Sequence, residues 1–240
     1  MIDPASKLIV SLDTSSLKHA EEIAESMVGL VKWLKIGSQL FTSEGPIAVR
    51  LFKEKGFSVF LDLKFHDIPE TVGKAAAVAV NIGADMFNVH ASGGSDMMKK
   101  ALNSSMERSN TLGVEAPTLI AVTVLTSMDQ KNLYEIGVRN TPKIQVLELA
   151  MEANKIGLDG IVASPIEASM IRSNGAFPPG FKLITPGIRP SWFHQDDHKR
   201  TMSPKKAIEC GSDFLVVRRP IITAENPGDA VRKMLEEITG

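Results

Sequence analysis

The sequence predicts an α/β protein that forms a single-domain (β/α)8 barrel, the TIM-barrel fold, over residues 1–240. The length of 240 residues is close to the ~250 typical of this barrel. Short β-rich segments alternate regularly with amphipathic helical segments, as in a parallel sheet. Segments such as Leu119–Val122 and Phe214–Val217 are almost wholly apolar, which is typical of strands that are covered on both faces.

The expected strands follow one another at roughly even intervals. In chain order they are Leu8–Asp13, Trp33–Gly37, Ser58–Lys64, Met86–His90, Thr118–Thr126, Gly160–Ser164, Lys182–Gly187 and Phe214–Arg219. Eight such units in a chain of this length favour closure into a barrel over an open sheet. No linker, low-complexity tract or shift in composition divides the chain, so we expect one domain.

Helical segments lie between the expected strands. The clearest are Ser16–Val28, Thr71–Ile82, Lys143–Ile156 and Asn226–Ile238. Asn226-Pro227 suits a helix start, because asparagine caps a helix and proline is tolerated at its first position. A glycine ends the helical pattern and precedes a strand at positions Gly56, Gly83, Gly157 and Gly211, the usual place for a helix stop.

Composition narrows the class of protein. The 27 basic and 28 acidic residues leave a net charge of −1, which argues against a nucleic-acid partner. Cys210 is the only cysteine, so no intramolecular disulfide can form, and a reducing compartment is expected. The start, Met1-Ile2-Asp3-Pro4, does not resemble a signal peptide, and no apolar run is long enough to span a membrane. We therefore expect a cytoplasmic protein with no membrane partner.

Polar residues fall at the carboxyl end of almost every expected strand, where barrels of this fold build their active sites. They are Asp13, Lys35, Asp62 with Lys64, His90, Thr126, Ser164, Arg189 and Arg218 with Arg219. Unrelated surface residues would not be expected to collect at one end of every strand. This end of the barrel is therefore the candidate site.

The third expected strand carries the densest group, Asp62-Leu63-Lys64-Phe65-His66-Asp67. Side chains at i and i+2 of a strand share a face, so Asp62 and Lys64 should point the same way. Asp67 follows where Ile68-Pro69 ends the strand pattern. Carboxylates beside an ammonium keep it protonated, and the group is therefore a candidate for proton delivery. We expect His66 and His90 to be hydrogen-bonded supports near this site.

The loops after the last two strands predict a phosphate site. They contain Pro186-Gly187-Ile188-Arg189 and Arg218-Arg219, and the loops after strands seven and eight often bind phosphate in this fold. The planar fork of arginine suits a phosphate dianion. Residues 190–202 are polar and poor in helix signals, so they could form a lid that closes over a ligand.

Three segments together resemble one known family: Asp62–Thr71 (DLKFHDIPET), Thr123–Ser127 (TVLTS) and Thr185–Pro190 (TPGIRP). They look like the orotidine 5′-phosphate decarboxylases of the short bacterial type. The similarity covers essentially the whole chain, to Arg219-Pro220. The ten-residue segment is far more specific than the Asp-x-Lys-x-x-Asp spacing alone.

The resemblance implies decarboxylation of orotidine 5′-phosphate to uridine 5′-phosphate (UMP), the last step of de novo pyrimidine synthesis, without a metal or a cofactor. It implies that Lys64 donates a proton to C6 of the pyrimidine and that Asp62 lies beside the substrate carboxylate. It also implies a homodimer in which Asp67 reaches into the other subunit's site. Lys35 would hold the charged array. The expected substrate contacts are Asp13, Lys35, Asp62, Thr71, Thr126, Ser164, Arg189, His198, Arg218 and Arg219.

Two positions depart from the family pattern. Arg218-Arg219 stands where the family usually has Gly-Arg, and His198 aligns with a lid glutamine, although Gln195 lies nearby. Arg218 could contribute its backbone N–H, with its side chain either turned outward or joining the phosphate site. His198 could donate one hydrogen bond to the ligand.

Two other functions remain open. The first is that of a magnesium-dependent sugar-phosphate decarboxylase or synthase on the same barrel, which places a carboxylate on the second strand. Here that strand reads Leu34-Lys35-Ile36-Gly37, and an ammonium cannot ligate Mg²⁺, which needs oxygen donors. The second is that of a non-catalytic nucleotide-binding barrel. A barrel that has lost its catalytic activity would be expected to lack some residues of the charged array. Here all four are present: Lys35, Asp62, Lys64 and Asp67.

Overall fold

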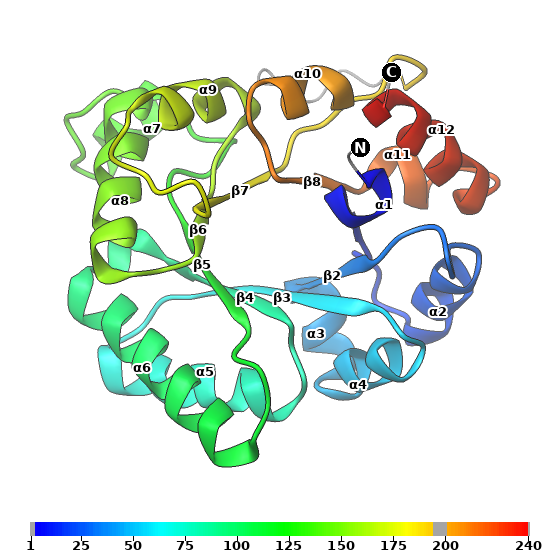
Figure 1. Cartoon of the computed structure of the whole chain (residues 1–240), viewed down its shortest axis with the longest axis horizontal. Coiled ribbons are helices and arrows are strands. Elements are labelled where there is room, and N and C mark those ends of the chain that lie inside the picture. Colours follow the sequence, from blue (N-terminus) through cyan, green and yellow to red (C-terminus); the bar gives the residue numbers. More distant parts are fainter. Residues whose placement is uncertain (1–2, 194–200, 240) are drawn as a thin grey trace.

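Eight parallel strands close into a barrel in chain order, from β1 to β8 (Figure 1). The computed structural model describes residues 3–193 and 201–239. The strands are β1 Leu8–Ser11, β2 Trp33–Gly37, β3 Ser58–Phe65, β4 Met86–His90, β5 Thr118–Val122, β6 Gly160–Val162, β7 Lys182–Thr185 and β8 Phe214–Val217. The expected (β/α)8 barrel is confirmed.

Helices surround the barrel (Figure 1). They are α1 Pro4–Lys7, α2 Leu17–Glu25, α3 Ser38–Glu44, α4 Ile47–Glu54, α5 Pro69–Asn81, α6 Ser95–Leu112, α7 Gln130–Glu135, α8 Pro142–Ile156, α9 Pro165–Ser173, α10 Pro204–Glu209, α11 Arg219–Ile222 and α12 Pro227–Thr239, with a 3-10 turn η1 at Ala91–Gly93. The four glycines expected to end helices have φ values of 87°, 87°, 93° and 98°, the left-handed conformation of a helix stop. No helix within the described ranges is long and apolar enough to cross a membrane.

Five strands end earlier than the sequence pattern suggests. β1, β5, β6, β7 and β8 stop before the residues that were expected to end them. The backbone leaves the sheet there to enter loops and helix starts, as at Ser164, which precedes α9, and Arg218, which precedes α11. The polar residues therefore lie in the loops and helix starts just beyond the strands. β3 instead runs one residue further than expected, to Phe65.

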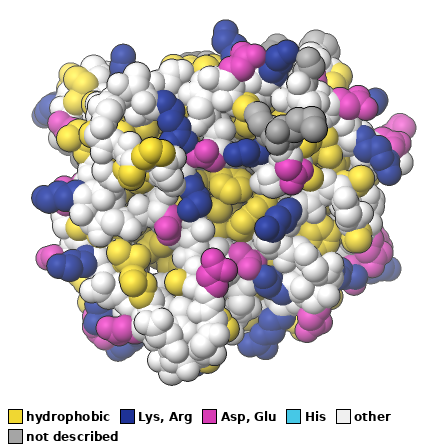
Figure 2. Space-filling view, in the orientation of Figure 1, with side chains coloured by type: hydrophobic (Ala, Val, Ile, Leu, Met, Phe, Trp, Pro, Cys, Tyr) yellow, Lys and Arg dark blue, Asp and Glu magenta, His cyan; other side chains and the backbone are white. Residues whose placement is uncertain are grey.

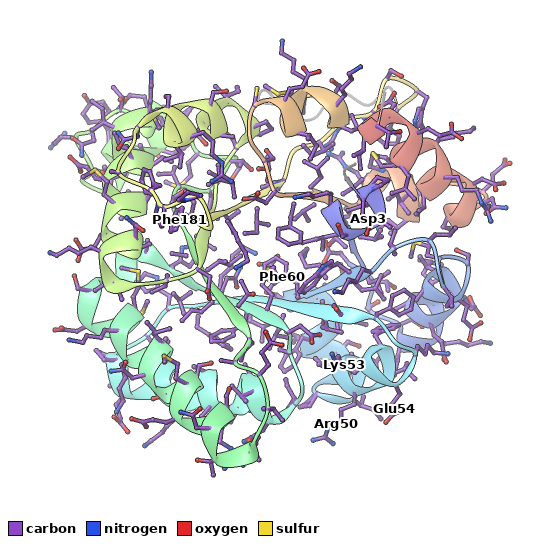
Figure 3. The ribbon with its side chains drawn as sticks, viewed as in Figure 1. Asp3, Arg50, Lys53, Glu54, Phe60 and Phe181 are labelled. Atoms are coloured by element: carbon purple, nitrogen blue, oxygen red, sulfur yellow. The ribbon has the colours of Figure 1, made fainter. Side chains whose placement is uncertain are left out.

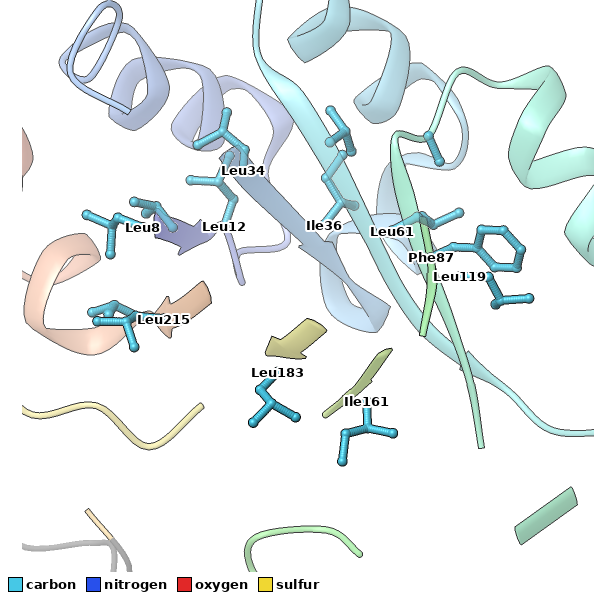
Figure 4. Packing of buried hydrophobic residues seen from close by; sticks show 14 of the residues in the cluster. Leu8, Leu12, Leu34, Ile36, Leu61, Phe87, Leu119, Ile161, Leu183 and Leu215 are labelled. Atoms are coloured by element: carbon cyan, nitrogen blue, oxygen red, sulfur yellow. The ribbon is translucent and has the colours of Figure 1, made fainter. Parts of the chain in front are cut away.

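Alternation along the strands separates two apolar layers. Figure 4 shows the outer one, in which side chains point from the strands toward the helices. Its members include Leu8, Leu12, Leu34, Ile36, Leu61, Phe87, Leu119, Ile161, Leu183 and Leu215. The residues between them face the barrel interior. There Ile9, Phe60, Met86, Ile120 and Ile184 form a second cluster.

The interior cluster fills the amino-terminal part of the barrel. Figure 3 places Phe60 inside the ring of strands, whereas Arg50, Lys53 and Glu54 of α4 lie outside it. Trp33 and Phe214 pack against this cluster, with ring centroids 5.7 Å apart in an edge-on arrangement. In the space-filling view, apolar side chains likewise gather near the middle of the face, within a ring of charged ones (Figure 2). The polar site must therefore lie at the opposite, carboxyl ends of the strands.

Three aspartates anchor the amino-terminal end of the barrel. Asp85, Asp159 and Asp213 each precede a strand, and each carboxylate accepts the backbone N–H of a residue on the preceding strand. The acceptor distances are 2.7 Å from Val59 N, 2.7 Å from Leu119 N and 2.8 Å from Leu183 N. These carboxylates tie neighbouring strands together and belong to the scaffold.

Candidate active site

Lys35, Asp62 and Lys64 form a continuous charged array inside the carboxyl end of the barrel. Lys35 Nζ lies 2.9 Å from Asp62 Oδ2, and Lys64 Nζ lies 2.6 Å from Asp62 Oδ1. Lys35 and Asp62 are buried, at 7% and 8% exposure, while Lys64 is more open. The expected pairing of Asp62 with Lys64 on one face is confirmed, and Lys35 joins them from β2.

The carboxylate of Asp62 is held ionised between the two ammonium groups. Burial raises the pKa of Asp62, but the charges of Lys35 and Lys64 and their hydrogen bonds outweigh burial and bring the pKa below its usual value. The Asp62 carboxylate thereby holds two lysine side chains at the carboxyl end of the barrel. Lysine side chains in such a site suit a ligand that is negatively charged.

Lys64 departs from regular strand geometry. Its φ of 53° is the only positive φ among non-glycine residues of the described chain. A lysine in this conformation costs about 1–2 kcal/mol, and such strain tends to persist at functional sites. The pairing of β3 with β4 shifts register between Leu61 and Phe65, which is a bulge that redirects the side chain.

Asn88 of β4 supports both members of the pair on β3. Its Nδ2 donates to Asp62 Oδ1 at 2.7 Å, and its Oδ1 accepts from Lys64 N at 2.8 Å. Asn88 is fully buried. Asn88 was not predicted from the sequence. The alternation of strand residues could have indicated it, because Asn88 lies between Met86 and His90 on the inward face of the same strand.

Asp13 connects the array to the mouth of the barrel. Its Oδ2 accepts from Ser11 Oγ at 2.8 Å and lies 3.4 Å from Arg218 Nε, while its Oδ1 lies 3.4 Å from Lys35 Nζ. The Arg218 side chain therefore turns toward Asp13 rather than outward. Its half-exposed guanidinium bridges β8 to the end of β1 through Asp13.

A pocket of about 340 Å³ opens beside this network. It is lined by Ser11, Asp13, Lys35, Thr126, Pro186, Gly187, Arg189, Val216, Arg218 and Arg219. The loops after β7 and β8 therefore bring three arginines to one pocket, next to a lysine of the array. This cluster of cations has the chemistry of a phosphate site.

Ser164 is buried and bound to Glu167. Its backbone N–H donates to Glu167 Oε2 at 2.7 Å, and its hydroxyl donates to the same oxygen. Glu167, which the sequence reasoning did not select, caps the start of α9 in this way. The hydroxyl oxygen of Ser164 keeps its acceptor capacity.

Asp67 and Thr71 do not join the array within one chain. Both are exposed, and Asp67 Oδ1 accepts from the backbone of Ile68 at 2.6 Å. Neither lines the arginine pocket. The structure thus separates Asp67 from Asp62 and Lys64, its neighbours in the sequence motif.

His66 and His90 lie next to each other near Lys64, with ring centroids 5.3 Å apart and a tilt of 39° between the ring planes. Burial lowers the pKa of His90, and the charges of His66 and Lys64 lower it further, against an opposing effect of Asp62. His90 is therefore neutral near pH 7. His198, the expected lid contact, lies outside the described residues.

The acidic residues that the structure describes do not form a metal centre. Within residues 3–193 and 201–239, no group of three or more His, Cys, Asp or Glu side chains could hold a metal ion. Lys35 Nζ stands between Asp13 and Asp62, at 3.4 and 2.9 Å, so an ammonium occupies the space between these two carboxylates.

A larger cavity of about 710 Å³ lies outside the barrel, at the starts of α8 and α9. Its charged lining is limited to Lys143 and Glu167, and the latter is bound to Ser164. It contains none of the array residues. The pocket at the strand ends is therefore the candidate site.

The fold and the site define the class of protein: a (β/α)8 barrel with a buried lysine–aspartate–lysine array beside a cationic pocket. Residues 6–234 match the family model described as orotidine 5′-phosphate decarboxylase / HUMPS family. The orotidine 5′-phosphate decarboxylase of Pseudoalteromonas translucida is 47% identical over 226 residues, which cover 94% of each chain. That of Syntrophotalea carbinolica is 45% identical over 238 residues, covering 99% of this chain and 97% of the relative.

Solved structures agree with the sequence relatives. The crystal structure of orotidine 5′-phosphate decarboxylase from Lactobacillus acidophilus superposes with a TM-score of 0.85 at 34% identity, covering 98% of this chain and 100% of that one. The chain belongs to the orotidine 5′-phosphate decarboxylase / HUMPS family, and it is an enzyme of the carboxy-lyase class.

Proposed function

We propose that this chain decarboxylates orotidine 5′-phosphate to uridine 5′-phosphate, without a metal or a cofactor. The observation that carries the proposal is the Lys35–Asp62–Lys64 array at 2.9 and 2.6 Å, directly beside a pocket lined by three arginines. The pocket suits the phosphate and ribose, and the array suits the reacting end of the nucleotide. Relatives at 45–47% identity bear the name of this enzyme.

The chemical problem is an anion with no resonance sink. The bond from C6 to the carboxylate breaks, CO2 leaves, and the electron pair stays on C6. A site accelerates this step only by interactions that strengthen as the charge develops. The ammonium of Lys64 supplies such an interaction and then transfers a proton from Nζ to C6. Solvent reprotonates the amine to complete the cycle.

Asp62 would lie next to the substrate carboxylate. Its pKa is lowered, so it remains charged and repels that group until CO2 departs. Asp62 also holds both lysines in place through its ion pairs. The repulsion and the lysine attraction both favour loss of CO2.

The remaining residues would hold the rest of the nucleotide. Asp13 and Thr126 line the pocket and would contact the ribose, and Ser164 would face the pyrimidine ring. Arg189, Arg218 and Arg219 would bind the phosphate, with His198 as a lid contact. The largest enzymatic accelerations correspond to roughly 23 kcal/mol, which one lysine cannot supply. Phosphate binding must therefore contribute through orientation and closure.

A homodimer completes the proposed site. Asp67 and Thr71 are exposed and lie outside the pocket of their own chain. They follow β3 directly, at the same end of the barrel as the array. We therefore assign both to the site of a second copy, where Asp67 would flank the partner's lysine. The expected compartment is the cytoplasm, and neither nucleic acid nor a membrane is a proposed partner.

The decisive assay follows the loss of orotidine 5′-phosphate absorbance and the release of CO2, with and without EDTA. The proposal predicts turnover that EDTA does not change. Turnover abolished by EDTA would instead assign the chain to the magnesium-dependent branch of the family. Absence of turnover in both conditions would point to a non-catalytic barrel.

A further inference from the structure

Asn88 closes a ring of contacts around the charged pair on β3. Asp62 Oδ1 accepts from both Lys64 Nζ and Asn88 Nδ2, at 2.6 and 2.7 Å. The carbonyl oxygen of the same amide accepts from Lys64 N at 2.8 Å. One side chain thus fixes the carboxylate of Asp62 and the backbone of Lys64 at once.

The bulge in β3 explains why a side chain is needed at this point. The ladder between β3 and β4 pairs Leu61 with Phe87 and then resumes at Phe65 with Val89. Lys64 lies within the interruption, and the amide of Asn88 accepts its N–H. A buried N–H without an acceptor would be costly.

The same contact constrains the backbone of Lys64. Its φ of 53° is a conformation that a non-glycine residue holds only when its surroundings enforce it. The amide of Asn88 is fully buried, so water cannot replace it readily. An asparagine is suited to this position because it offers both a donor and an acceptor on one rigid group.

We propose that Asn88 is a positioning residue for the reaction, which holds the Lys64 ammonium and the Asp62 carboxylate at the distance that proton transfer to the substrate requires. This inference rests on the proposed function of Lys64. Asn88 acts through these two residues and need not touch the substrate. It therefore should affect the rate of the chemical step more than nucleotide binding.

Two substitutions separate positioning from general stability. Asn88→Ala removes both contacts, and a displacement of about 1 Å in a catalytic group can cost about 100-fold in rate. Asn88→Asp keeps the acceptor for Lys64 N, but it places a second carboxylate beside Asp62. Two carboxylates that share a site raise one apparent pKa, so the acid limb of the kcat profile should move to higher pH.

Thr185→Val is the matched control. Thr185 is fully buried on β7, and its hydroxyl donates to Ser212 Oγ at 2.8 Å. The substitution removes a buried side-chain hydrogen bond from a barrel strand at a residue that does not line the arginine pocket. It should lower thermal stability but leave kcat and the pH profile unchanged.

The experiment measures kcat with orotidine 5′-phosphate, the Kd for UMP and the pH profile of each protein. Both Asn88 variants should lose at least about tenfold in kcat with UMP affinity nearly retained, and Asn88→Asp should shift the acid limb upward. If Asn88→Asp does not fold, Asn88→Ala alone tests the proposal, through its loss of kcat compared with its affinity for UMP. Two results would overturn the positioning role, provided that the wild-type protein is active. The first is a kcat in both Asn88 variants equal to that of the wild type. The second is a loss of kcat in Asn88→Asp while the acid limb of its pH profile stays where it is in the wild type. A wild-type protein without turnover would instead overturn the proposed function and this inference with it.

Discussion

Gly37 lies against the carboxylate of Asp13, so closely that no side chain fits between them. A Cβ at position 37 would stand 2.6 Å from Asp13 Oδ1 and 2.9 Å from Lys35 Nζ. Gly37 faces inward on β2, two residues after Lys35. The absence of a side chain there gives the ion pair of Lys35 and Asp13 its space.

Gly37→Ala should therefore impair the site without straining the backbone. Gly37 has φ −94° and ψ −177°, which alanine adopts freely. The new methyl group must displace Asp13 or Lys35, and we expect kcat/KM to fall about 10- to 100-fold. Steady-state kinetics checks this. Gly180→Ala is the control, since a Cβ there meets nothing within 4 Å. Equal kinetics in the two variants would contradict the expectation.

The aspartates at the amino end of the barrel should affect stability alone. In the wild type the N–H of Leu119 donates to the Asp159 carboxylate at 2.7 Å. Asp159→Ala removes this acceptor. Leaving a buried donor unpaired costs about 1–3 kcal/mol. Urea unfolding should show this loss, while the activity of the folded protein stays at the wild-type level. A large loss of kcat with unchanged stability would place Asp159 in the site instead.

His90 should make the protein less stable in mild acid. Burial, with the charges of His66 and Lys64, lowers the pKa of His90 from its usual 6.5. The unfolded chain therefore binds a proton more readily than the native protein, and the free energy of unfolding falls as the pH drops below about 6.5. Urea unfolding at pH 7.5 and 5.5 should show a smaller fall for His90→Gln than for the wild type. An identical fall would argue against this contribution.

Hybrid dimers test whether Asp67 serves the neighbouring subunit. Lys64→Ala and Asp67→Ala proteins should each be inactive, and a purified hybrid of the two should recover about half of the wild-type activity, because one of its two sites receives both native groups. A differently tagged pair, co-expressed and purified through both tags, supplies the hybrid. If Asp67 served its own chain, both sites of the hybrid would be damaged and no activity would return.

The barrel was predictable because its signals are local and repeated. Apolar runs in Thr118–Val122 and Phe214–Val217, with glycine stops before the strands, recur along the chain. The alternation of strand residues also placed Asp62 and Lys64 on one face, and the array confirms that placement. The strand ends were less predictable, since pairing with neighbours decides where a strand leaves the sheet.

The contacts within the site depend on side chains that barrel closure brings together. Arg218 lies on Asp13 because β8 pairs with β1, which the sequence alone does not specify. The bulge at Lys64 and the amide of Asn88 that spans it have no local signature. Asp67 follows Lys64 by three residues, yet the turn after β3 separates their side chains. The spacing of Lys64 and Asp67 in the sequence could not show that their side chains lie apart.

In the proposed reaction the Lys64 ammonium protonates C6, and other groups of the site bind the nucleotide. The most direct test is the turnover number of Lys64→Ala, measured together with its UMP affinity, with Lys18→Ala on the exposed face of α2 as the control. We predict that Lys64→Ala loses at least about 1,000-fold in kcat and binds UMP as the wild type does. Turnover by Lys64→Ala at the wild-type rate would rule out this role of Lys64.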